Sequence, residues 1–236
     1  MKILVISDLH LCDVRHKSIT DTERLEELAK FIKASETDAV LNLGDTVSRT
    51  PFRKESFPSL EDGFKFYLDW RSQFTIPFFE CAINRELGFF EKIMGAAPDS
   101  LFELSDNAAV ITMAPQADSD HTFLPGQLEF LTGALNFCKG KTVVIGTHVP
   151  FPGSCSREDK PGTFLDIPMP FKNFLVSFPG RIIWCGGHFH WKQEPPTTTG
   201  ALTALYASRF QLTDEGSYSS IIDTETGNIN CIHHNF

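Results

Sequence analysis

The sequence predicts an α/β protein in which short buried strands alternate with helices. Apolar residues dominate the runs at 2–7 and 38–43, without the polar alternation of a half-exposed strand, which is typical of strands buried on both faces. Between these runs lies a segment whose apolar residues have helical spacing. Strand, helix and strand in this order form a βαβ unit, the building block of the α/β class.

The helix of this unit begins at a capping signal. Thr20 is followed three residues later by Glu23, which is the spacing of a capping box. Leu25, Leu28 and Ile32 then recur at helical spacing, and charged side chains occupy the opposite face. The segment therefore predicts an amphipathic helix that packs its apolar stripe on the sheet.

The same alternation continues along the chain. Further strands are expected at 77–83, 141–146 and 181–185. Further helices are expected at 60–74, 86–94, 127–138 and 170–177.

The last part of the chain changes character. Shorter strands are expected at 202–207, 218–223 and 228–233, and a glycine-containing hairpin turn at 224–227 joins the last two. A tail rich in strands, after alternating helices and strands, predicts a second sheet packed on the first.

Each of the first five predicted strands ends in a short polar group. Ligands of open α/β sheets bind beyond the carboxyl ends of the strands, so these groups are expected to converge on one site. Together they supply seven metal-ligand candidates, namely Asp8, His10, Asp45, Asn84, His148, His188 and His190. Four imidazoles, one amide and two carboxylates suit a pair of divalent ions. Two metals about 3.5–4 Å apart favour in-line displacement at phosphorus by a metal-activated water.

The ordered motifs resemble those of the calcineurin-like metallophosphoesterase family. Asp-x-His, Gly-Asp, an Asn motif, a His and Gly-His-x-His follow one another between residues 3 and 190, each after a strand. The resemblance implies a metallophosphoesterase-like αββα sandwich, in which two mixed sheets are flanked by helices. It also implies that Asp45 bridges two ions, which would be Mn, Fe or Zn. One ion would be held by Asp8, His10 and His190, and the other by Asn84, His148 and His188.

One motif departs from the family pattern. Where the family usually has Gly-Asn-His before an acidic residue, this chain has Ile83, Asn84, Arg85 and Glu86. The missing His serves in family members as a general acid or as a stabiliser of transition-state charge. Arg85 stays protonated and could take only the second role. The alternative is a surface salt bridge to a nearby Glu. A degenerate acid position favours substrates with good leaving groups.

Arg49 is a second candidate for contact with substrate phosphate. Residues 44–49 resemble the Gly-Asp-x-Val-Asp-Arg stretch of protein Ser/Thr phosphatases, in which the Arg binds phosphate, although Ser48 replaces the acidic residue. A solvated loop Arg is the alternative. His16 and His121 lie in polar segments with no partner at ligand spacing, and both are expected to be exposed.

Length and composition narrow the remaining possibilities. The 236 residues predict a single domain spanning 1–236, with insertion or lid segments at about 49–74 and 150–170. A net charge of −9 argues against extended nucleic-acid and anionic-membrane binding. Six cysteines without close pairing favour a reducing compartment. Because no targeting or membrane-spanning run is seen, a cytoplasmic protein is expected. The oligomeric state is left open.

Taken together, these features favour a dinuclear metal-dependent phosphoesterase with a small phosphorylated substrate. The substrate is expected to be a phosphodiester or an activated phosphate ester or anhydride, and manganese is among the expected metals. Two alternatives stay open. One is a phosphomonoesterase or protein phosphatase, and the other is a degenerate metal-binding interaction module, because Arg85 breaks the acid motif.

Overall fold

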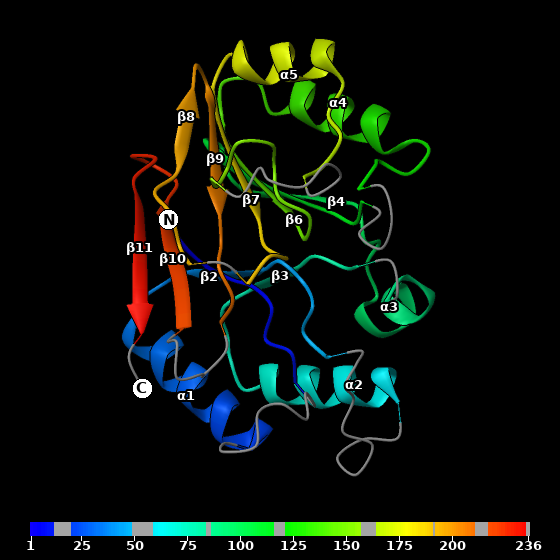
Figure 1. The fold of residues 1–236 in the computed structure, drawn as a ribbon, viewed down its shortest axis with the longest axis vertical. Coiled ribbons are helices and arrows are strands. Elements are labelled where there is room, and N and C mark those ends of the chain that lie inside the picture. Colours follow the sequence, from blue (N-terminus) through cyan, green and yellow to red (C-terminus); the bar gives the residue numbers. More distant parts are fainter. Residues whose placement is uncertain are drawn as a thin grey trace.

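Two mixed β-sheets lie face to face, with helices on their outer sides (Figure 1). The computed structural model describes residues 1–11, 20–48, 59–83, 86–115, 121–156, 164–190, 192–210 and 217–234, and the structural statements below concern these residues. The four layers form the αββα sandwich that the sequence predicts, so the predicted fold class is confirmed.

The first sheet has five strands in the order β11-β10-β1-β2-β3. Their bounds are Lys2–Ile6 (β1), Ala39–Asn42 (β2), Phe78–Glu80 (β3), Ser217–Asp223 (β10) and Ile229–His234 (β11). Strands β1, β2 and β3 run parallel, whereas β10 pairs antiparallel with β1 and β11 pairs antiparallel with β10. The helices that connect this half are α1 (Asp21–Ala34), α2 (Leu60–Arg71) and α3 (Leu87–Met94).

The second sheet has six strands in the order β4-β5-β6-β7-β9-β8. Their bounds are Ser100–Ser105 (β4), Ala108–Met113 (β5), Thr142–Thr147 (β6), Arg181–Gly186 (β7), Thr197–Thr199 (β8) and Leu202–Tyr206 (β9). The four inner strands are parallel, and the edge strands β4 and β8 are antiparallel to their neighbours. Helices α4 (Gln127–Phe137) and α5 (Met169–Val176) cover its outer face (Figure 1).

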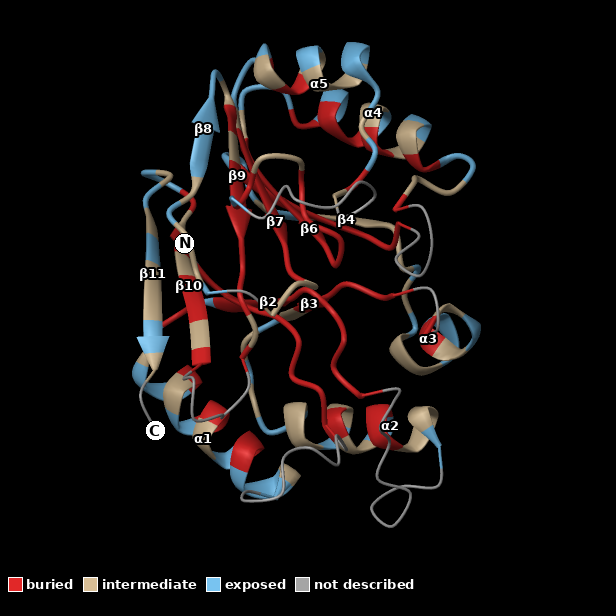
Figure 2. Cartoon of the chain, in the orientation of Figure 1, coloured by how far each residue is buried: buried red, intermediate tan, exposed pale blue. Residues whose placement is uncertain are grey.

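Side chains alternate along each inner strand and so divide the core into three apolar layers. On β1, Leu4 packs toward α1 and α2, whereas Ile3 packs toward the other sheet. On β6, Ile145 packs toward α4 and α5, whereas Val144 faces the first sheet. Figure 2 shows the inner strands of both sheets buried between the layers and the helices exposed on their outer sides. Near-continuous apolar strands are required because both faces of both sheets are covered.

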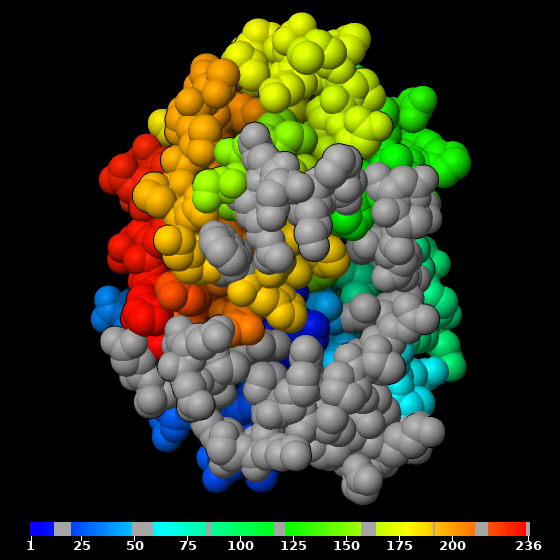
Figure 3. All heavy atoms as spheres, in the orientation of Figure 1, coloured from blue at the N-terminus to red at the C-terminus, as the bar shows by residue number. Residues whose placement is uncertain are grey.

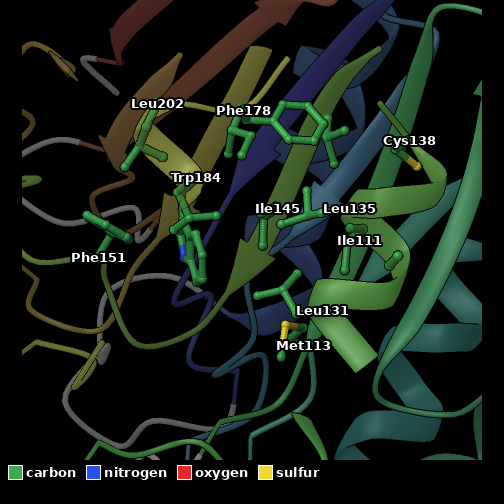
Figure 4. Close-up of a cluster of buried hydrophobic side chains, with 14 of the residues drawn as sticks. Ile111, Met113, Leu131, Leu135, Cys138, Ile145, Phe151, Phe178, Trp184 and Leu202 are labelled. Carbon is green, nitrogen blue, oxygen red and sulfur yellow. The ribbon is translucent and has the colours of Figure 1, made fainter. Parts of the chain in front are cut away.

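The outer core of the second sheet illustrates this packing. Leu131 and Leu135 of α4 point toward Ile111 and Ile145 of the sheet, with Trp184 nearby (Figure 4). All five side chains are fully buried. Burial of each large apolar side chain contributes roughly 1.5–3 kcal/mol, so this layer adds substantially to the stability of the second sheet. The segments of His148 and His188 follow strands of this sheet.

The helix α1 forms as the capping signal predicts. Thr20 Oγ1 accepts a hydrogen bond from Glu23 N at 3.2 Å, and the Glu23 carboxylate accepts one from Thr20 N at 2.7 Å. Leu25, Leu28 and Ile32 are buried against the first sheet. The predicted capping box and apolar stripe are therefore both confirmed.

The strands of the tail join both existing sheets instead of forming a sheet of their own. β10 pairs antiparallel with β1, and β9 pairs parallel with β7. The expectation that the tail makes the second sheet is therefore wrong, because that sheet is built on β5, β6 and β7 and the tail strands cover free edges. Strands β4, β5 and β8 were not predicted at all.

The two expected insertion segments are described in part. In the first, Phe64 and Tyr67 of α2 are buried in the core, while residues 49–58 lie outside the described residues. In the second, Phe151 and Leu165 are buried in the core beneath α5. A lid role for either segment stays a prediction. Within the described residues, no helix has the length and apolar character needed to span a membrane.

His234 on β11 makes the stability of the fold sensitive to acid. Its ring packs edge-on against Phe31 with centroids 4.3 Å apart, and Ser219 Oγ lies 2.9 Å from its Nε2. Burial, together with the nearby charge of His233, lowers the pKa of His234 to about 4 from an ordinary value of 6.5. The unfolded chain therefore binds this proton first, so the stabilising contribution is present above pH 6.5 and is lost as the pH falls toward 4.

We expect His234→Phe to remove this acid sensitivity. The free energy of unfolding of the variant should fall less between pH 6.5 and 4 than that of the parent, by about 1 kcal/mol, because solvent screens the half-exposed ring. Urea unfolding at several pH values measures the difference. His233→Gln, at the exposed neighbouring position, serves as the control and should keep most of the parent's slope. Equal slopes in parent and His234→Phe would contradict the prediction.

Candidate metal centre

The carboxyl ends of β1, β2, β6 and β7 meet at one place between the two sheets. Backbone hydrogen bonds join these ends: Asp8 N donates to Gly44 O at 3.0 Å, and Gly187 N donates to His148 O at 2.9 Å. His188 N donates to Asp8 Oδ2 at 3.0 Å and links the two sheets. In Figure 3, dark blue N-terminal atoms and lighter blue atoms from farther along the chain are visible beside gold atoms of the segment after β7. Polar groups far apart in the chain are thus brought together.

Asp8, His10 and His190 form the first group of ligand atoms. His10 Nε2 lies 2.7 Å from His190 Nε2, and Asp8 Oδ1 lies 3.2 Å from His190 Nε2 and 3.6 Å from His10 Nε2. Ligand atoms bound at about 2.0–2.2 Å to one ion stand about 2.8–3.6 Å apart in tetrahedral or octahedral geometry. The three atoms therefore have the spacing that a single divalent ion requires.

The second group contains Asp8, Asp45 and His148, whose ligand atoms lie within 4.8 Å of one another. His188 adjoins this group, with its Nδ1 3.1 Å from His148 Nε2. Asp45 Oδ2 lies 3.5 Å from His10 Nε2 and 3.9 Å from His148 Nε2. It therefore stands between one histidine of each group, which is the position that a bridging carboxylate needs.

His148 is oriented with a lone pair toward the site. Its Nδ1 lies 3.1 Å from Leu43 O. A carbonyl oxygen can only accept a hydrogen bond, so Nδ1 carries a hydrogen, and in the neutral ring Nε2 presents its lone pair to the site. A backbone carbonyl that fixes the tautomer in this way is the usual outer partner of a metal-binding histidine.

The electrostatics of the group also fit cations. Asp8, Asp45, His10 and His148 are all buried. Burial alone would raise the pKa of Asp8. The charge that His148 carries when it is protonated, followed by hydrogen bonds from His10 and His190, outweighs this effect, so the pKa of Asp8 lies well below its usual range. Two carboxylates buried near one another need compensating positive charge, and the mixed nitrogen and oxygen donors suit divalent ions such as Zn, Fe or Mn.

Gly187 of the last motif is required by the close approach of the two strand ends. A Cβ atom at this position would lie 1.9 Å from Ser7 Oγ and 2.7 Å from Asp8 Oδ2. Any larger residue would push Asp8 out of place. The glycine before the two histidines therefore permits the contact between the sheets from which the site is made.

A buried polar network supports the loop that carries Asp45. Asn42 Nδ2 donates to Thr46 Oγ1 and to Glu80 Oε2, both at 2.8 Å. Glu80 also accepts hydrogen bonds from Tyr67 Oη at 2.9 Å and from Arg71 at 3.0 Å. Burial raises the pKa of Glu80, against the opposing charge of Arg71 and these hydrogen bonds. The network joins the carboxyl ends of β2 and β3 behind the site.

Six of the seven predicted ligand residues are brought together, and the seventh lies outside the described residues. Asn84 is that residue, and Arg85 and Arg49 also lie outside the described part of the chain. The neighbours of the Asn84 motif are described: Glu86 is buried, and its carboxylate accepts a hydrogen bond from Ile83 N at 3.0 Å. This contact joins the two described residues that flank the motif, after the carboxyl end of β3.

His121 is a residue of the site that the sequence did not indicate. It is buried, with only 8% of its surface exposed. Its ring lies 5.4 Å from that of His188, at an interplanar angle of 83°. The expectation of an exposed side chain is therefore wrong. The signal that could have found it is the apolar run of β5, which ends eight residues before His121 and points to the same edge as β6. His16 lies outside the described residues.

Comparison with known proteins agrees with the fold and the motifs. A sequence model of the calcineurin-like phosphoesterase family matches residues 1–192, and the chain belongs to this family. No curated protein sequence matches it.

Two solved structures show the same fold. A dimetal phosphatase from Danio rerio is 10% identical, with a TM-score of 0.75 over 100% of this chain and 96% of that chain. A Staphylococcus aureus protein with a provisional assignment as a 5′-nucleotidase, solved with alpha-ketoglutarate, is 14% identical, with a TM-score of 0.59 over 99% of this chain and 53% of that chain. At these identities the likeness concerns the fold.

Proposed function

We propose that the protein is a dinuclear metal-dependent phosphoesterase that hydrolyses a phosphodiester, or an activated phosphate ester or anhydride, of a small molecule. The observation that carries the proposal is the convergence of two carboxylates and four imidazoles from four strand ends, with neighbouring ligand atoms 2.7–3.9 Å apart. Membership of the phosphoesterase family supports the reaction class.

In this proposal the residues divide into two overlapping sets around the bridging Asp45. One set is Asp8, His10 and His190, and the other is His148, His188 and Asn84. Two divalent ions held there would supply an activated water and polarise the phosphoryl group. Two carboxylates and neutral ligands leave such a pair of ions net positive, so the site attracts a phosphate. Asp8 belongs to both groups of ligand atoms, and its Oδ2 is occupied by Ser7 and His188 N, which leaves Oδ1 for the first group.

The cations of the substrate site are proposed to be Arg85 and Arg49. Arg85 follows β3, whose parallel neighbour β2 leads to Asp45, and Arg49 follows Asp45 by four residues. A guanidinium offers fixed donors to phosphoryl oxygens but does not release a proton near neutral pH. Leaving groups that need no protonation are therefore preferred, and this argues for activated esters, anhydrides and diesters over alkyl monoesters.

The proposed activity is tested with aryl and alkyl phosphate monoesters and diesters in the presence of added Mn²⁺, together with metal analysis of the purified protein. We expect two metals per chain and turnover of aryl diesters above alkyl monoesters. Faster turnover of monoesters or of a phosphopeptide would favour a phosphomonoesterase or protein phosphatase. Bound metal without hydrolysis of any of these substrates would favour an interaction module.

We expect Arg85→Ala to lower kcat/KM on a bis-nitrophenyl diester roughly 10- to 1000-fold. This corresponds to a loss of about 1.5–4 kcal/mol of transition-state stabilisation, the scale for removal of one hydrogen-bond donor to the charge of the transition state. Arg85→His should restore turnover of poor leaving groups and change that of good ones little. Arg181→Ala is the control, because Arg181 lies against Gly227 at the amino end of β7, whereas the site lies at the carboxyl ends of the strands. Kinetics of Arg85→Ala identical to the parent would remove Arg85 from the site.

A further inference from the structure

His121 lies against one of the proposed ligands from outside the motifs. Its ring meets that of His188 edge-on, with centroids 5.4 Å apart. The ring of His188 also meets that of His148 edge-on, with centroids 5.0 Å apart and an interplanar angle of 77°. His188 is only half-buried, whereas His121 and His148 are buried. The buried rings of His121 and His148 therefore contact the half-buried ring of His188 from two directions.

The fold brings His121 to this place by the same rule that brings the ligands. β5 runs parallel to β6, and Met113 at its end pairs with Thr147, the residue before His148. Two backbone hydrogen bonds link His121 to the segment after β6. Asp166 N donates to His121 O at 2.9 Å, and the preceding residue, Leu165, donates from its N to Pro150 O at 3.0 Å. His121 therefore belongs to the carboxyl edge of the sheet, where the site stands.

The backbone of His121 shares an uncommon conformation with the ligands. Among the described residues, seven that are not glycine have positive φ, and five of these are proposed metal ligands. The sixth is Glu36, in the turn after α1, and the seventh is His121 with φ of 51°. Residues other than glycine adopt this conformation at a cost in energy and persist in it where the surroundings hold them, most often at functional sites.

We propose that His121 is a positioning residue that fixes the ring of His188 and thereby sets the affinity of the metal position formed by His148 and His188. The inference rests on the proposed function of the site. The ring of His188 is half-buried and meets the buried rings of His121 and His148 edge-on, at centroid distances of 5.4 and 5.0 Å. An edge-on aromatic contact favours one ring orientation, the one in which Nδ1 lies 3.1 Å from His148 Nε2. Loss of such outer support typically lowers metal affinity 10–100-fold.

The test is calorimetric titration of the metal-free protein with Mn²⁺. In His121→Ala, affinity at one of the two positions should fall 10–100-fold, while the position formed by His10 and His190 stays unchanged. His121→Phe should retain most of the parent affinity, because a phenyl ring can make the same edge-on contact. Phe164→Ala is the matched control: it removes a ring that packs edge-on against Phe189 at 5.3 Å, not against a ligand. Urea unfolding of each metal-free variant establishes that it is folded.

Three outcomes would overturn the inference. His121→Ala could bind both ions as the parent does, Phe164→Ala could lose as much affinity as His121→Ala, or His121→Phe could lose as much as His121→Ala. Binding of inorganic phosphate to the Mn²⁺-loaded proteins distinguishes a positioning role of His121 from direct contact with substrate. Weaker phosphate binding in His121→Ala with unchanged Mn²⁺ affinity would make His121 a substrate contact and not a positioning residue. Failure of the parent to bind Mn²⁺ would instead overturn the proposed function itself.

Discussion

Asp45→Asn is expected to abolish metal-dependent hydrolysis and to leave at most one metal ion per chain. Asp45 Oδ2 lies between His10 Nε2 at 3.5 Å and His148 Nε2 at 3.9 Å, so its charge is placed to serve both groups of ligands. A neutral amide of the same shape cannot compensate two cations as a carboxylate does, and two metals held side by side are needed for the in-line displacement. The steric change is small, so a large loss of activity and bound metal would be due to the missing negative charge.

Metal analysis and hydrolysis of an aryl diester measure the effect. Asp38→Asn is the matched control, because Asp38 stands at the amino end of the same strand, where its carboxylate accepts a hydrogen bond from Lys2 N at 2.7 Å. The control should keep both ions and the parent's activity. Two ions per chain in Asp45→Asn would contradict the bridging role.

His10→Ala and His190→Ala are expected to empty the same metal position and to leave the other occupied. Their Nε2 atoms lie 2.7 Å apart, and Asp8 Oδ1 is within 3.6 Å of both. Each ring therefore supplies a ligand to one ion. Because a metal ion contributes several kcal/mol of transition-state stabilisation, each variant should lose at least about 100-fold in kcat/KM.

Anomalous scattering from crystals of the two variants identifies which position is empty. His233→Ala is the control, because His233 is an exposed histidine that stacks on Tyr218 away from the site, and it should retain both ions. Loss of metal from different positions in His10→Ala and His190→Ala would show that the two residues serve different ions.

Much of the central architecture could be predicted because its signals are local. The apolar runs before Asp8, Asp45 and His148 need no information beyond their own residues to be recognised as strands buried on both faces. The capping box at Thr20 and the stripe from Leu25 to Ile32 likewise depend on spacing within one helix. The polar groups at the ends of these strands then follow from the geometry of parallel sheets.

The hairpin of β4 and β5 was missed for a physical reason. Residues of β4 are mostly half-buried or exposed, which is expected of an edge strand with one covered face. β5 is fully buried but short, and a short apolar run does not by itself distinguish a strand from a buried helix. Without β5 there was no strand end to associate with His121, and its polar surroundings in the sequence resembled an exposed loop.

By itself, the sequence determined the α/β class, the order of the strand-end motifs and the set of donor groups that suits two divalent ions. These depend on periodicity, on residue type and on position relative to a strand end, all of which are local. Only the tertiary structure decided that the tail strands divide between the sheets, that Asp8 adjoins both ligand groups, that Leu43 O orients His148 and that His121 packs on His188. The contacts within the site join residues 40 to 180 positions apart, and β10 pairs with β1 from the other end of the chain. Such pairing depends on the packing of the whole chain and not on any local pattern.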